Sequence, residues 1–219
     1  MFKKSLLAAT LGFAAITATA SPVGLKFVSV NTAVLSEVSV NGHNLNTAIG
    51  SYNLKASDSA STLVGFCVDP FQWANTTMTS YDKSSLDATD FFSGNGTQRF
   101  ANAQKLFDNA YSTLSGATQT AGFHLALWEI FHDNLSTTSG NILGTSASNA
   151  GMLTAANTFL GALSGWNTTN AYNLTFYGSG NYQDFLVANP SAVPLPAALP
   201  LLASGLIGFV AMRRRNKKA

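Results

Sequence analysis

The 219-residue sequence has few charged side chains, three histidines and a single cysteine. Charged residues make up only 10% of it, fewer than in an ordinary cytoplasmic enzyme and too few for a chain kept disordered by charge. No Gly-x-Ser-x-Gly elbow, P-loop or dinucleotide-binding glycine pattern occurs, so the common hydrolase and nucleotide-binding classes lack support. A single cysteine also excludes an intrachain disulfide. The composition therefore favours an exported protein without catalytic activity.

The positive charges lie mainly at the two ends of the chain, and the formal net charge of +2 comes from those ends. Without residues 1–20 and the C-terminal tail, five cations remain against ten carboxylates, which gives −5. The remaining cations are Lys26, Lys55, Lys83, Arg99 and Lys105. They form no stripe along the sequence, so nucleic acid is not an expected partner.

Residues 1–20 have the pattern of a secretory signal peptide. Lys3 and Lys4 precede an apolar run from Leu6 to Ile16, and small residues follow at Ala18 and Ala20. We expect export by the Sec machinery and cleavage by signal peptidase after Ala20. The body of the protein, residues 21–190, is then a single extracytoplasmic domain.

The C-terminal segment, residues 191–219, combines a proline-rich motif, an apolar stretch and a basic end. Residues 192–212 carry no charge and are long enough for a predicted transmembrane helix. The basic cluster that follows is typical of a cytoplasmic end. The motif consists of Val193, Pro194, Leu195, Pro196 and Ala197, and the basic cluster of Arg213, Arg214 and Arg215.

This C-terminal combination resembles the PEP-CTERM sorting signal in its VPLPA variant. The resemblance implies a Gram-negative bacterium with an exopolysaccharide system and an exosortase that removes the tail. The protein would first be an inner-membrane-anchored precursor and then part of the cell envelope or biofilm matrix, with exopolysaccharide as a partner. A permanent single-pass anchor is the alternative.

The sequence pattern of the body, residues 21–190, predicts an α+β fold. Apolar and polar residues alternate in four segments of residues 21–69, and Asn41-Gly42 predicts a hairpin turn between two of them. The helical period then predicts three helices within about 98–163, and strands return near 172–177 and 184–187. We expect an antiparallel sheet, a sandwich or barrel-like, packed against these helices, with loops at 71–96 and 136–148.

Cys67, at the end of a predicted strand, and the predicted helix that contains Trp128 suggest a possible reactive site. The segment 66–133 resembles bacterial thioester domains, in which a strand Cys forms an internal thioester with a Gln four residues before a Trp. That position is His124 here, which cannot form the acyl bond, whereas Gln119 lies five residues earlier. Five residues rotate a helical side chain by about 140°, so Gln119 and His124 cannot be interchangeable partners of Cys67.

Three interpretations of this site stay open. A thioester between Cys67 and Gln119 would make the chain a covalent surface adhesin. Cys67 and His124 could form the nucleophile and base of a hydrolase or transferase, although no oxyanion hole is evident. Alternatively, Cys67 is a small buried side chain beside a core His124 whose hydrogen bonds are satisfied.

No cofactor or metal site is expected. On one helix His124 and His132 would lie about 12 Å apart along the axis, too far to share a metal ion. Glu129 and His132 are read as a surface salt bridge. Several aromatic residues could stack on sugars, although most are expected in the core; they are Phe71, Trp73, Tyr81, Phe91, Phe92, Trp166 and Tyr172.

Overall fold

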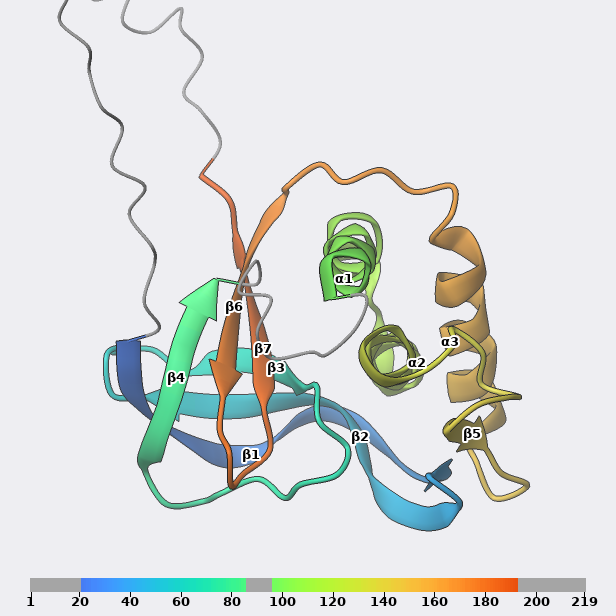
Figure 1. Cartoon of the computed structure of the whole chain (residues 1–219), viewed down its shortest axis with the longest axis horizontal. Coiled ribbons are helices and arrows are strands. Elements are labelled where there is room, and N and C mark those ends of the chain that lie inside the picture. Colours follow the sequence, from blue (N-terminus) through green and yellow to red (C-terminus); the bar gives the residue numbers. More distant parts are fainter. Residues whose placement is uncertain (1–20, 86–95, 193–219) are drawn as a thin grey trace, which may run out of the picture. The chain divides into compact units, whose positions relative to one another are not determined.

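The computed structural model describes residues 21–85 and 96–192 (Figure 1). One compact unit extends to Asn189, and only residues 190–192 of the second unit, Pro190–Ala219, are described. The strands are β1 (Ser21–Val40), β2 (His43–Ala56), β3 (Leu63–Cys67), β4 (Thr79–Ser85), β5 (Ile142–Gly144), β6 (Tyr172–Gly178) and β7 (Phe185–Pro190). The helices are α1 (Gly96–Ala110), α2 (Gly116–His132) and α3 (Ala150–Ala162), with a 3₁₀ turn, η2 (Tyr111–Thr113), between the first two.

The strands form one mostly antiparallel sheet that closes on itself. Their order is β2-β3-β7-β6-β4-β1-β5, and β1 also pairs with β2, so six strands complete a ring and β5 joins β1 outside it. The long strand β1 makes this closure possible. Its first residues pair with β4, its last with β5, and nearly its whole length with β2. Two register shifts between β1 and β2 interrupt the ladder, as β-bulges do where strands bend.

The turn between β1 and β2 confirms the predicted hairpin. Asn41 and Gly42 both have positive φ, 50° and 77°, as a type I′ turn requires. In the view of Figure 1, β1 and β2 run across the lower parts of β4, β6 and β7, and the three helices lie together to the right of β6 and β7, with β5 beside α3.

Helix α2 is the centre of the packing. All residues from Thr120 to Phe131 are buried, because one side of the helix packs on the sheet and the other on α1. Helix α3 approaches closely at Gly122, where an added Cβ would lie 2.5 Å from the Cβ of Ala155. A helix that is apolar nearly all round is stable in water only when it is enclosed in this way.

Two strands lie in segments predicted to be loops. Strand β4 falls within 71–96 and pairs with β1 and β6, and β5 falls within 136–148. Neither strand has the alternating apolar pattern that marks a strand in sequence, since Tyr81 is the one fully buried hydrophobic side chain of β4 among those described. These two segments are extended because they pair with neighbouring strands, which their own sequence pattern does not reveal.

The predicted fold class needs one correction, because no transmembrane helix is found among the residues that the structure describes. The structure shows a mostly antiparallel sheet with three helices, and none of the helices within 21–85 and 96–192 is long and apolar enough to cross a membrane. The longest, α2, has 17 residues, whereas a span needs about 20. Residues 193–212 of the predicted span, like the signal peptide at 1–20, lie outside the described residues.

Candidate functional site

Cys67 ends β3 and is completely buried. Its Sγ lies 3.1 Å from the backbone oxygen of Asp69, to which the thiol donates a hydrogen bond. Burial raises the pKa of the Cys67 thiol well above its ordinary value, because a thiolate would lose its hydration there. The nucleophilic form of the sulfur is therefore strongly disfavoured in this environment.

His124 lies in the buried part of α2 and uses both ring nitrogens for backbone contacts. Its Nδ1 accepts a hydrogen bond from the Gly50 N–H at 2.8 Å, and its Nε2 lies 2.7 Å from the oxygen of Cys67. Since Nδ1 accepts, Nε2 must carry the proton and donate it to that oxygen. Desolvation lowers the pKa of His124 to about 3, so the ring is neutral at physiological pH.

Trp128 follows one helical turn after His124 and binds the same backbone atom. Its Nε1 donates to the Cys67 oxygen at 3.1 Å, and the centroids of the His124 and Trp128 rings are 4.6 Å apart. Two ring N–H groups thus converge on one carbonyl oxygen and fasten the end of β3 to α2. We call Cys67, His124 and Trp128 the Cys67 cluster.

The close fit of β2 on β1 brings Gly50 to this cluster. A Cβ at this position would lie 2.1 Å from the Thr32 backbone oxygen and 2.5 Å from the Ala33 Cα. Only glycine leaves room for the two strands to meet here. The absence of a side chain therefore helps to place the Gly50 N–H against His124.

Gln119 is not part of the Cys67 cluster. It lies in the first turn of α2, is exposed, and its Oε1 accepts a hydrogen bond of 2.9 Å from the Ser115 N–H. The structure thus brings together Cys67 and His124 but leaves the Gln119 amide on the surface. The sorting motif at 193–197 and the basic cluster at 213–215 lie outside the described residues.

The predicted surface salt bridge between Glu129 and His132 is wrong. Glu129 is fully buried, and its Oε2 accepts a hydrogen bond from the Ser136 N–H. His132 directs Nε2 to the backbone oxygen of Val68. A glutamate near the end of a predicted helix is expected to face solvent. Here, however, other elements of the protein enclose the helix on several sides.

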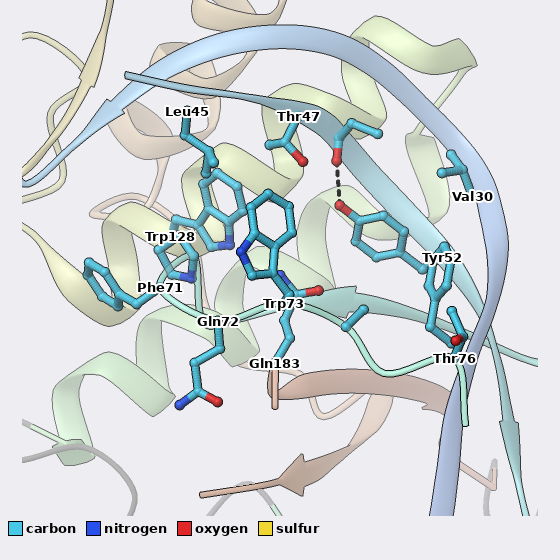
Figure 2. A pocket seen from close by; sticks show the side chains of 14 residues that line it. Val30, Leu45, Thr47, Tyr52, Phe71, Gln72, Trp73, Thr76, Trp128 and Gln183 are labelled. Carbon is cyan, nitrogen blue, oxygen red and sulfur yellow. Dashed lines mark hydrogen bonds between the residues drawn. The ribbon is translucent and has the colours of Figure 1, made fainter. Parts of the chain in front are cut away.

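A pocket of about 370 Å³ opens next to the Cys67 cluster, with Trp128 in its wall (Figure 2). The hairpin β1–β2 and the segment 70–76 supply most of its lining. The complete lining is Phe27, Val30, Leu45, Thr47, Ala48, Tyr52, Pro70, Phe71, Gln72, Trp73, Ala74, Thr76, Trp128 and Gln183. Sequence reasoning missed this pocket because its residues are scattered from 27 to 183, although Phe71 and Trp73 were among the candidate sugar-stacking residues.

Hydrogen bonds of backbone N–H groups hold the segment that carries Phe71 and Trp73. The Asp69 Oδ1 accepts from the Phe71 N–H at 2.8 Å, and the Trp73 oxygen accepts from the Gln183 N–H at 3.1 Å. The Phe27 N–H donates to the Asn75 oxygen at 2.8 Å. The exposed aromatic side chains thus stand on a segment tied to β1 and to the segment before β7.

No family model matches this sequence, and no curated protein matches it. Among solved structures, the fold is similar to the N-terminal thioester domain of a surface protein from Clostridium perfringens. The TM-score is 0.49 at 9% sequence identity, over 78% of this chain and 100% of that chain.

Proposed function

We propose that the chain is an exported, non-catalytic protein of the cell envelope or exopolysaccharide matrix that holds its partner non-covalently. The observation that carries the proposal is the state of the Cys67 cluster. The Cys67 sulfur is buried and hydrogen bonded, and neither His124 nitrogen is free to accept its proton. A nucleophile and base pair needs both of these groups to be available.

The route to that location is proposed from the two ends of the sequence. Residues 1–20 supply the signal for the Sec machinery and signal peptidase. The motif at 193–197 and the cluster at 213–215 supply the proposed exosortase signal in a Gram-negative bacterium. Exosortase, signal peptidase and exopolysaccharide are the partners that this proposal implies.

Covalent attachment is the second candidate function. It is favoured by the contact between β3 and α2, which are the two elements that a thioester would join. An internal thioester between Cys67 and Gln119 would form with loss of ammonia and would then acylate an amine on the partner, with the Cys67 thiol released. It requires the exposed Gln119 side chain to leave Ser115 and enter the core.

Extraction of the protein from the cell surface tests the proposal against this alternative. Boiling in detergent and reductant should release the chain as a single species with an N-terminus at Ser21 and without Arg213 to Ala219. Adducts of higher mass that disappear in Cys67→Ala would instead support the adhesin. Retention of the basic tail in all of the protein would contradict exosortase processing. Cys67-dependent turnover in a screen of esters and peptides would contradict the absence of catalysis.

A further inference from the structure

The pocket beside the Cys67 cluster combines exposed aromatic surface with neutral polar groups. Trp73 is 71% exposed and Phe71 51% exposed, large fractions for side chains of this size. Figure 2 shows the Trp73 indole among the lining side chains, with Trp128 to one side and Tyr52 to the other in that view. The hydroxyl groups of Thr47 and Thr76 and the amide of Gln183 supply polar groups of the lining.

None of the fourteen lining residues carries a formal charge. An ionised ligand would give up its hydration here without an opposite charge to replace it. The described body also has more carboxylates than cations, which further disfavours an anionic polymer. The ligand that fits is therefore uncharged.

We propose that this pocket binds a neutral saccharide, with Trp73 as the stacking surface for one pyranose ring. A pyranose has a face of C–H groups that packs on an indole and a rim of hydroxyl groups that both donate and accept hydrogen bonds. Threonine hydroxyls and glutamine amides also donate and accept, so they match that rim. The inference rests on the proposed non-covalent function and names the class of ligand that the function would require.

The size and the support of the pocket agree with this ligand. A volume of about 370 Å³ lies at the lower end of the range for small-ligand sites, which suits one or two sugar rings. The hydrogen bonds that hold segment 70–76 fix the backbone that carries the indole before binding, so little backbone conformational entropy is lost when the ligand arrives. A purely apolar peptide side chain would offer no hydrogen-bond partner to the hydroxyl groups of Thr47 and Thr76.

Tryptophan fluorescence and calorimetry with defined probes test the proposal. The neutral probes are glucose, galactose, mannose and N-acetylglucosamine, each with its β-1,4-linked hexamer. Hexagalacturonate and a Leu- and Phe-rich decapeptide serve as the anionic and the apolar probe. At least one neutral hexamer should bind the mature protein and change the tryptophan emission, whereas the anionic and apolar probes should not bind. Failure of every neutral probe, or preferential binding of either other probe, would overturn the inference.

Variants locate the binding site. Trp73→Ala should weaken binding of the neutral hexamer about tenfold or more, and Trp73→Phe should lose less because it keeps an aromatic face. Leu35→Ala is the matched control, since Leu35 is 75% exposed on β1 but does not line the pocket. Equal affinity of the wild type and Trp73→Ala would overturn the inference. Cys67-dependent adducts would contradict the proposed function while leaving saccharide binding as a separate result.

Discussion

Replacing His124 by alanine should lower the free energy of unfolding by about 3 to 5 kcal/mol. The variant leaves the Gly50 N–H without its acceptor and takes one of the two ring donors from the Cys67 oxygen. It also opens a cavity against the rings of Tyr52, Phe66 and Trp128. Urea unfolding followed by circular dichroism at pH 7.5, where the wild-type ring is neutral, measures the effect.

His43→Ala is the matched control, because His43 is an exposed histidine at the start of β2. Its free energy of unfolding should stay within about 0.5 kcal/mol of the wild type. A loss in His124→Ala no larger than in His43→Ala would show that the ring does not fasten β3 to α2. The structural interpretation of the Cys67 cluster would then fail.

Glu129→Gln should stabilise the protein at pH 8 to 9 but leave it nearly unchanged at pH 4. Burial is the main cause that raises the pKa of Glu129 to about 8, and its Oε1 has no hydrogen-bond partner among the described residues. The folded state therefore holds a proton that the unfolded state releases above about pH 4.5. Wild-type stability from this group is fully present below that pH and is lost as pH rises toward 8.

The difference between Glu129→Gln and the wild type isolates this effect. Other groups also contribute to the pH dependence, since burial lowers the pKa of His124 and raises that of Asp184 to about 7. Their contributions cancel in the comparison of the two proteins at each pH. Chemical unfolding from pH 4 to 9 should show the difference growing by about 2 to 4 kcal/mol. A difference that is the same at every pH would place Glu129 in contact with solvent.

Sequence pattern was informative where local chemistry determines local structure. Asn41-Gly42 selects a tight hairpin turn, and the run of apolar residues in α2 indicates a central helix. The three described helices lie within 96–162, close to the predicted region of about 98–163. Period and turn residues act over a few positions, so a single sequence reveals them.

Features that depend on distant neighbours were missed. Strand β4 exists because β1 and β6 pair with it, and Glu129 is buried because α2 is enclosed by other elements. The pocket joins β1, β2, the segment 70–76 and residues 128 and 183, whose contacts no periodicity encodes. For the Cys67 cluster, sequence named Cys67 and His124 but could not choose among three chemistries. The structure adds the partners of the two ring nitrogens and the exposure of Gln119, and the proposed non-catalytic function rests on these observations.

The intact mass of the mature protein, with and without prior treatment with methylamine, tests the central claim that Cys67 is a structural thiol. We predict a full mass without loss of ammonia, no methylamine incorporation, and alkylation of Cys67 by iodoacetamide only after unfolding. The buried sulfur and the surface position of Gln119 are the reasons. A mass lower by one ammonia, together with methylamine incorporation at Gln119, would contradict the account and establish the covalent adhesin in its place.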